Sequence, residues 1–251
     1  MTDLRGRSAV VTGGNSGIGL ALAVGLARAG ADVAVWARNP QRSRAAVDEL
    51  KSHGVQALAV ACEIGDEQSV VEATAQTVQA FGKIDILIAN AGIADAKGYL
   101  DTSIEDWHHV MRTNVDGTFL TTREVGRHMV ERGQGGAMVV VSSTVSRYGA
   151  ATQAAYAASK SACASLGRTI AVEFARHQIR CNILIPGWVA TPMNDHLRAN
   201  EKFFDVTVRR TPARRWAEPS EFHDVAAFLA DPALTFHTGN EVVVDGGYTI
   251  F

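Results

Sequence analysis

The chain has 251 residues, which is ordinary for a single α/β domain, and its 24 Lys and Arg nearly balance its 26 Asp and Glu. A net charge of -2 offers no basic face, so we expect neither nucleic acid nor a membrane surface as a partner. No stretch approaches the roughly 18 apolar residues of a membrane span, and the first residues lack the apolar core of a signal peptide. These features predict a cytoplasmic protein.

Cysteine and histidine usage argues against disulfides and metals. Cys62, Cys163 and Cys181 are odd in number and widely spaced, which predicts reduced, structural thiols. The eight histidines show none of the spacings of a metal-binding helix, and the adjacent His108 and His109 point to different helix faces. We therefore expect no metal site.

Short apolar runs alternate with longer segments of helical periodicity along the whole chain. The runs predicted to be strands are 8–12, 32–37, 56–62, 84–90, 137–143, 179–186 and 240–246. Examples of the predicted helices are 18–30, 68–82, 107–133 and 156–177. This alternation predicts an α/β fold with a doubly wound parallel sheet of about seven strands flanked by helices, in one domain spanning 1–251. Residues 187–220 break the rhythm as an insertion before the last strand.

The first predicted strand is followed by TGGNSGIG, Thr12 to Gly19. Glycine lets the backbone turn tightly and approach a pyrophosphate, which then lies at the positive N-terminus of the next helix. Gly13, Gly17 and Gly19 supply this turn between the first strand and the first helix, where nucleotide-binding sheets hold phosphates. Glycine clusters also cap helices and form turns, but the position between strand and helix favours a dinucleotide.

The end of the second predicted strand, DVAVWARNPQR, indicates which dinucleotide is preferred. Enzymes that choose NAD usually place an acid here, about twenty residues beyond the glycine turn. This chain has Ala37 followed by Arg38, whose guanidinium can pair with a 2'-phosphate, and Arg42 is near enough to assist. NADP is therefore the predicted cofactor, with NAD possible. The alternative is that Arg38 stacks on adenine or faces solvent.

The stretch SSTVSRYGAATQAAYAASK, 142–160, carries the predicted acid–base chemistry. Tyr156 and Lys160 stand four residues apart on a predicted helix and so share one face, where the ammonium favours the phenolate. Tyr156 is then the acid in reduction and the base in oxidation. Ser143, at the carboxyl end of a strand, can hydrogen-bond the substrate oxygen. Tyr148 competes for the acid role, but no lysine follows it by four residues, and it is predicted to line the substrate cleft.

These motifs, together with ANAG at 89–92, Asn114 and IPGWVATPM at 185–193, resemble the short-chain dehydrogenase/reductase family in its classical subgroup. The resemblance spans essentially the whole chain, although the glycine spacing differs from GxGxxG. It implies a Rossmann-type sheet, a nicotinamide cofactor, and carbonyl reduction or alcohol oxidation. It also implies that Asn114 holds a water in a proton path from Lys160, and that Lys160 binds the nicotinamide ribose.

The resemblance extends to the remaining cofactor residues and to assembly. Glu63 stands where an Asp contacting adenine is usual, and the family is commonly a homotetramer built through helices such as 107–131 and 156–176, so we expect a homotetramer, or failing that a dimer. The implied cofactor-binding set is Gly13, Asn15, Ser16, Gly17, Ile18, Gly19, Arg38, Asn39, Cys62, Glu63, Asn90, Ala91, Gly92, Tyr156, Lys160, Pro186, Gly187, Val189 and Thr191.

The insertion at 187–220 is predicted to be a lid over the substrate. It offers apolar side chains that include Trp188 and Met193, which with Ser143 and Tyr148 are the predicted substrate contacts, although these residues could instead pack on the sheet or a neighbouring subunit. We expect a ketone or secondary alcohol with an apolar body. Arginines at 209, 210, 214 and 215 leave room for an anionic substrate or an acidic carrier protein, and the second choice is a 3-oxoacyl thioester.

Two other functions remain open from the sequence. A nucleotide-binding sensor or scaffold could keep this fold without turnover, but such a protein would be expected to lose Tyr156 or Lys160, and both are present. A sugar-nucleotide epimerase or dehydratase could use the same pair, but typically has a longer C-terminal substrate domain and another glycine spacing. A hydride-transferring enzyme is the first interpretation.

Overall fold

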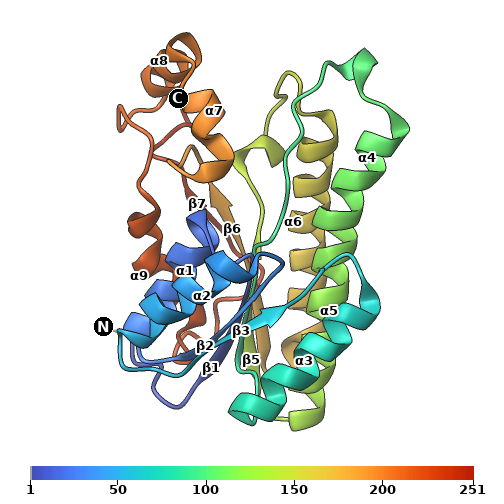
Figure 1. Cartoon of the computed structure of the whole chain (residues 1–251), viewed down its shortest axis with the longest axis vertical. Helices are drawn as coiled ribbons and strands as arrows, with labels where there is room; N and C mark the ends of the chain where they lie inside the picture. Colours follow the sequence, from blue (N-terminus) through green and yellow to red (C-terminus); the bar gives the residue numbers. More distant parts are fainter. Residues whose placement is uncertain (1) are drawn as a thin grey trace.

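The computed structural model describes residues 2–251, which form a parallel seven-stranded sheet between two layers of helices (Figure 1). The strand order is β3-β2-β1-β4-β5-β6-β7, so the order reverses between β1 and β4. This is the predicted doubly wound fold, and the prediction is confirmed. The strands are β1 Ser8–Thr12, β2 Asp32–Ala37, β3 Ala57–Ala61, β4 Ile86–Ala89, β5 Gly136–Val141, β6 Ile179–Pro186 and β7 Glu241–Val244.

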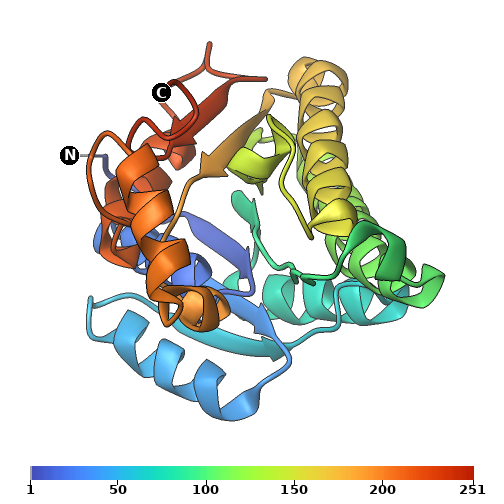
Figure 2. The ribbon, with the colours of Figure 1, turned by 90° about the horizontal axis from the view of Figure 1, so that it is seen from above.

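Helices cover both faces of the sheet, as Figure 2 shows from above. One layer consists of α1 Gly17–Arg28, α2 Pro40–Lys51 and α9 His223–Ala230. The other consists of α3 Glu67–Phe81, α4 Ile104–Met111, α5 Gly117–Arg132 and α6 Ala154–Phe174. Two further helices lie near the top of Figure 1, above the sheet, namely α7 Asp195–Arg198 and α8 Glu201–Arg210.

The central strands are mostly apolar because both of their faces are buried. In β2, Val33 and Val35 pack in the core beneath α1 and α9, while Trp36 packs in the opposite core with Val60 and Met129. All eight residues of β6 and all five of β1 are buried. The absence of polar alternation in the sequence thus reflects a sheet covered on both sides.

The segment 107–133, expected as one helix, is divided in the structure. A π-helical turn, Arg112–Asp116, separates α4 from α5. Within this π-helical turn, the side chain of Asn114 hydrogen-bonds the backbone of Ile93. The irregular geometry thus directs Asn114 toward the loop after β4. Single π turns inside helices are frequent at functional positions. The expected insertion at 187–220 contains α7 and α8, and its two ends meet at the bridge Val189–Ala217.

A buried carboxylate, that of Asp85, joins β1 and α5 at the amino-terminal edge of the sheet. Asp85, only 3% exposed, accepts hydrogen bonds from the backbone N–H of Ser8 at 3.0 Å and from Arg132 at 2.5 Å. The ammonium of Lys83 lies 3.2 Å from the same carboxylate and the guanidinium of Arg7 3.4 Å from it. Burial by itself raises the pKa of Asp85, but the Ser8 and Arg132 hydrogen bonds outweigh burial and hold that pKa below its ordinary value.

Replacing Asp85 by Asn should lower the free energy of unfolding by about 3 kcal/mol at pH 7, because Arg132 loses its buried ionic partner. A carboxyl with a lowered pKa stabilises the fold above its unfolded-state pKa, and this contribution is lost as the pH falls through the folded-state value. The difference between wild type and variant in urea unfolding should therefore shrink below about pH 4. The exposed Asp48→Asn is the control, and equal losses in both variants would contradict the role of Asp85.

Candidate active site

A large cavity of about 890 Å³ opens at the carboxyl ends of the strands. Its wall includes the turn after β1, the residues after β2 and β4, the end of β5, the start of α6 and the segment from β6 to α7. The turn after β1 and the loop after β4 diverge here, because the strand order reverses between these two strands. Open α/β sheets bind their ligands at such a reversal. The volume lies at the upper end of the range for ligand pockets.

The turn after β1 depends on glycine. Gly13 and Gly17 have φ values of +64° and +55°, which favour glycine. A Cβ on Gly19 would lie 2.3 Å from the carbonyl oxygen of Gly13 and 2.4 Å from Nδ2 of Asn90. Within residues 2–251, the Ser16 side chain makes no capping hydrogen bond to α1, so the first N–H groups of this helix are left for an anion. The turn can hold a pyrophosphate.

Hydrogen bonds between Thr12 and Asn90 join the ends of β1 and β4. The hydroxyl of Thr12 accepts from the backbone N–H groups of Asn90 and Ala91, at 2.9 and 3.0 Å. The side-chain amide of Asn90 donates to the carbonyl of Thr12 at 3.0 Å. These bonds set the distance between the glycine turn and the loop after β4.

One end of the cavity is formed by the residues after β2 and β3. Arg38 follows β2, and its guanidinium donates to the Glu63 carboxylate at 3.0 Å. Asn39 caps α2 by accepting from the N–H of Arg42 at 2.9 Å. Asn15, in the glycine turn, donates to the hydroxyl of Ser43 in α2 at 3.1 Å. This end therefore presents arginine and amide groups and the Glu63 carboxylate. The last position of β2 is Ala37 and carries no acid.

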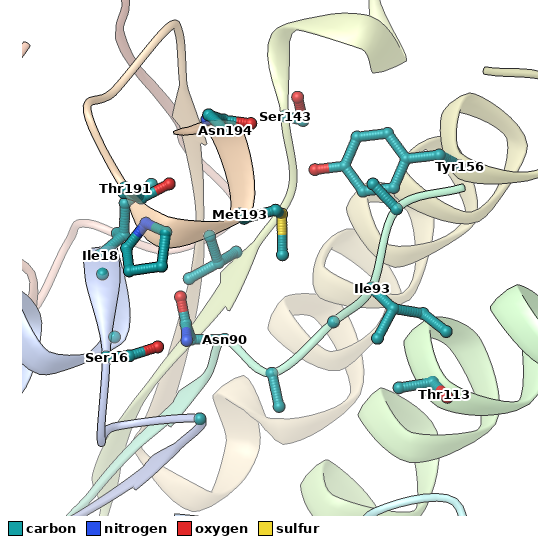
Figure 3. Close-up of a pocket in the computed structure, with 18 of the residues that line it drawn as sticks. Ser16, Ile18, Asn90, Ile93, Thr113, Ser143, Tyr156, Thr191, Met193 and Asn194 are labelled. Carbon is teal, nitrogen blue, oxygen red and sulfur yellow. The ribbon is translucent and has the colours of Figure 1, made fainter. Parts of the chain in front are cut away.

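At the other end, Ser143 and Tyr156 point into the same part of the cavity (Figure 3). Ser143 follows β5 by two residues, and Tyr156 lies in the first turn of α6. One turn further along α6, Lys160 is only 5% exposed; its ammonium donates to the carbonyl of Val141 at 2.9 Å and lies 5.8 Å from the centre of the Tyr156 ring. A buried cation is thus held beside the phenol.

Ser142, the neighbour of Ser143, serves the fold. Its hydroxyl donates to the backbone carbonyl of Lys160 at 2.8 Å and ties β5 to α6. Gly92 allows the loop after β4 to pass close to the same region, because a Cβ there would lie 3.0 Å from Oδ1 of Asn114 and 3.3 Å from Nζ of Lys160. Ser142 therefore holds Lys160 close to the end of β5, and Gly92 lets the loop after β4 approach the ammonium of Lys160.

Asn114 is fully buried behind the cavity. Its side-chain oxygen accepts from the N–H of Ile93 at 2.8 Å, and its amide nitrogen donates to the carbonyl of Ile93 and to the hydroxyl of Ser159, both at 2.9 Å. Its backbone carbonyl accepts from Thr118 at 2.6 Å. The side chain therefore fixes the loop after β4, while its expected part in a water relay stays a prediction.

Two aromatic residues of the cavity wall, Tyr148 and Trp188, belong to an aromatic cluster. Trp188 stacks on Trp216 with ring centres 5.2 Å apart, and Tyr148 lies 5.7 Å from Tyr248. Burial raises the pKa of Tyr148 to about 12, against the opposing effect of its hydrogen bond to Thr144. A phenol whose pKa is raised is a weaker acid than an ordinary tyrosine and forms the phenolate less readily, which argues against Tyr148 as the acid–base residue.

The cavity brings together most of the residues singled out from the sequence. Asn114 and Val189 do not line it; Val189 is fully buried, and its carbonyl accepts from the side chain of Asn194 at 3.1 Å. The predicted residues that do line it are Gly13, Asn15, Ser16, Gly17, Ile18, Gly19, Arg38, Asn39, Cys62, Glu63, Asn90, Ala91, Gly92, Ser143, Tyr148, Tyr156, Lys160, Pro186, Gly187, Trp188, Thr191 and Met193.

Sequence reasoning missed several polar residues of the cavity, among them Gln153, Asn194 and His196. Gln153 precedes Tyr156 by three residues, and this spacing on a helix would have placed both on one face. Asn194 and His196 carry no such signal, because their positions depend on how the insertion folds over the sheet.

Comparisons with known proteins agree with this site. A family model described as enoyl-(acyl carrier protein) reductase matches residues 13–249. The chain is 38% identical over 248 residues to gluconate 5-dehydrogenase of Gluconobacter oxydans, covering 99% of this chain and 96% of that protein. The crystal structure of a short-chain type dehydrogenase/reductase from Mycobacterium marinum superposes with a TM-score of 0.94 at 34% identity, covering 98% of this chain and 97% of that one.

The chain belongs to the short-chain dehydrogenase/reductase family. Another member, a gluconate 5-dehydrogenase from Burkholderia cenocepacia in complex with NADP and tartrate, has a TM-score of 0.94 at 36% identity and covers 99% of this chain and 97% of its own. The predictions of an enzyme and of an oxidoreductase acting between a hydroxyl and a keto group are confirmed. The alternative of a sensor or scaffold is set aside.

Two structural observations accompany this assignment. Among residues 2–251, no helix is long and apolar enough to cross a membrane. In the same part of the chain, no group of three or more His, Cys, Asp or Glu side chains could hold a metal ion.

A methyl group at Gly19 should disrupt the short-chain dehydrogenase site. In Gly19→Ala the new Cβ collides with the backbone of Gly13, so the turn must shift away from the phosphates. We expect the affinity for a nicotinamide cofactor to fall about tenfold or more in a fluorescence titration. Gly149→Ala is the control, because a Cβ on Gly149 has no atom within 4 Å in the described chain. Unchanged affinity in Gly19→Ala would refute this role of the turn.

Proposed function

We propose that this enzyme interconverts a secondary hydroxyl and a keto group on a small polyhydroxy acid, with NADP as the preferred cofactor and NAD as a possible one. The observation that carries the proposal is the pairing of Tyr156 and Ser143 in one cavity, with the ammonium of Lys160 buried beside the phenol ring. The glycine turn lines the same cavity, so one ligand can reach both the turn and the phenol.

The residues present fit a nicotinamide dinucleotide. The uncapped start of α1 and the glycine turn suit its pyrophosphate, and Arg38 with Arg42 suits a 2'-phosphate. The absence of an acid at Ala37, the last residue of β2, removes a group that would repel this phosphate. The Burkholderia cenocepacia relative, whose structure contains NADP, supports the same choice. The nicotinamide ring, when bound, accepts or supplies the hydride.

The side chains at the other end of the cavity manage the proton and the substrate oxygen. Tyr156 gives its proton to the carbonyl oxygen in reduction and removes the hydroxyl proton in oxidation. Ser143 hydrogen-bonds the same oxygen as its charge develops. In this proposal Lys160 stabilises the phenolate electrostatically and binds the ribose hydroxyls, and Asn114 belongs to a proton path. The ammonium of Lys160 donates to Val141, and Asn114 accepts from Ile93.

Two features favour a polyhydroxy acid over the apolar substrate expected from the sequence. The buried atoms Gln153 Oε1 and Trp188 Nε1 have no hydrogen-bond partner within residues 2–251, and both side chains line the cavity. A hydroxyl-bearing substrate would satisfy such groups. The Gluconobacter oxydans relative is named for gluconate.

A 3-oxoacyl thioester is the second candidate. The matching family model is described by an acyl carrier protein reductase, and the arginines near the cavity could meet an acidic carrier. The segment 187–220 acts as a lid in either case: its two ends are joined at Val189 and Ala217, and the helices between them can move over the substrate. The cavity residues Trp188 and Met193 belong to this segment.

Replacing Tyr156 by Phe should abolish turnover while leaving cofactor binding largely intact, because only a transferable proton is removed. With NADPH and a panel of keto acids, ketones, neutral sugars and acyl thioesters, we expect the best activity on a keto sugar acid. The rate of Tyr156→Phe should fall about 100- to 10,000-fold, measured by absorbance of the reduced cofactor. Lys160→Ala should impair both turnover and cofactor binding.

Tyr148→Phe provides the matched control, since it removes the competing phenol from the same cavity. Its rate should fall far less than that of Tyr156→Phe. The acid–base role of Tyr156 would be wrong if the two variants retained equal rates. The substrate class would be wrong if the best activity were confined to acyl thioesters or to neutral sugars.

A homotetramer is proposed on the basis of exposed apolar side chains at two separate places. Phe119 of α5 and Val172 of α6 are 45% and 79% exposed, and lie in the helices expected to pair. Phe236, Ile250 and Phe251 near the C-terminus are 97%, 89% and 73% exposed. Exposed apolar side chains in both parts of the chain support, in this proposal, the two interfaces that a tetramer needs. A cytoplasmic location, compatible with three free and buried cysteines, is part of the same proposal.

Light scattering at micromolar concentration should give about four times the chain mass of 26.7 kDa. Placing a charge in the first region, with Val172→Glu, should reduce the assembly to a dimer because the ion loses its water when the helices pair. Gln79→Glu, at an exposed polar position of α3, which is not one of the helices expected to pair, is the control. A wild-type monomer would refute the proposed assembly.

A further inference from the structure

Arg38 already has an ionic partner in the protein. Its guanidinium donates to one oxygen of Glu63 at 3.0 Å, and the other oxygen of Glu63 accepts from the N–H of Gly65 at 3.4 Å. The two side chains extend from adjacent strands, since Ala37 of β2 is paired with Ala61 of β3. Both line the cavity and remain open to solvent, with side-chain exposures of 64% and 45%. A carboxylate therefore lies beside the arginine that would hold a 2'-phosphate.

The position of this carboxylate matters for only one of the two cofactors. A 2'-phosphate brings about two negative charges to Arg38, and Glu63 then either repels these charges or gives up its own ion pair. A ribose 2'-hydroxyl brings no charge and meets neither penalty. Glu63 thus weakens binding of the phosphorylated cofactor relative to the other, since an adenine contact of Glu63 is shared by both.

We propose that Glu63 competes with the 2'-phosphate for Arg38 and so limits the preference of this enzyme for NADP over NAD. The inference rests on the proposed use of NADP and adds a specificity-determining residue to it. Because the pair is exposed, the effect is modest, on the order of three- to tenfold in relative affinity. This effect of Glu63 would let a chain without an acid at the end of β2 accept NAD as well as NADP.

Four proteins test the competition: wild type, Glu63→Gln, Arg38→Ala and the double variant. Each is titrated with NADPH and NADH by fluorescence, and with adenosine 2'-monophosphate and adenosine by calorimetry, at low and high salt. Glu63→Gln should raise the affinity for NADPH relative to NADH, and for adenosine 2'-monophosphate relative to adenosine, about three- to tenfold, because any contact of residue 63 with adenine is common to both members of each pair. The gain should diminish in the Arg38→Ala background and at high salt.

Glu67→Gln is the matched control, because Glu67 is also an exposed partner of an arginine, Arg123, but lies outside the cavity wall. An equal gain in NADPH affinity from Glu67→Gln would reduce the effect to net charge and overturn the inference. Equal changes for NADPH and NADH in Glu63→Gln, or no change, would overturn it too.

The proposed function is judged separately in the same experiment. Loss of NADPH affinity in Arg38→Ala supports NADP as the cofactor whatever Glu63 does. If that loss is seen and Glu63→Gln gives no gain, the inference fails and the proposed function stands. If the wild type binds neither cofactor, both fail.

Discussion

The structure depends on the reversal of strand order between β1 and β4. Parallel connections leave β1 toward one face and β4 toward the other, so the loops that follow these strands separate and a cavity opens between them. Thr12 is joined to the loop after β4 by three hydrogen bonds, two from Asn90 and one from Ala91, and these hold the opening at a fixed width. Every other part of the site is placed relative to these hydrogen bonds.

The two ends of the cavity differ in how far their charged groups are exposed to solvent. At the end near β2 and β3 the groups are exposed and charged, so their interactions are weak, adjustable and sensitive to salt. At the end near α6 the lysine is buried, and its ammonium is held by a backbone carbonyl. An electrostatic effect on a neighbouring phenol is much stronger in such an environment than in water. The groups proposed to bind the 2'-phosphate are therefore loosely held, whereas the groups proposed to transfer the proton lie beside a buried, hydrogen-bonded cation.

Most of the fold was predictable because buried parallel strands are continuous apolar runs. Segments 8–12, 32–37 and 179–186 agree with the strands as observed. The predicted strand 84–90 is longer than β4, since Asp85 and Asn90 at its ends bind β1 through their side chains. The predicted helix 107–133 is interrupted, because the π turn is matched to a contact between Asn114 and Ile93, distant in sequence. Local periodicity carries no information on such contacts.

The site also combines features that local sequence patterns predict with features that depend on contacts distant in sequence. Ser143, Tyr156 and Lys160 could be found from their spacing, because a strand end and one helix face bring them together. The ion pair between Arg38 and Glu63 could not, since it depends on the register of two strands and on the rotamers of two long side chains. Asn194 and His196 were likewise hidden, because nothing in the sequence of the insertion tells how it folds over the cavity.

The four-residue strand β4 is bound to β1 at both of its ends. Asp85 precedes β4 and holds Ser8, the first residue of β1, while Asn90 follows β4 and holds Thr12, the last. β4 thus acts as a spacer of fixed length. One residue more or fewer between Asp85 and Asn90 would break one of the two attachments and turn the intervening side chains to the wrong face. An insertion in the turn at Gly54 meets no such constraint, because a Cβ on Gly54 would have no atom of the described chain within 4 Å. The length of β4, in contrast, is fixed.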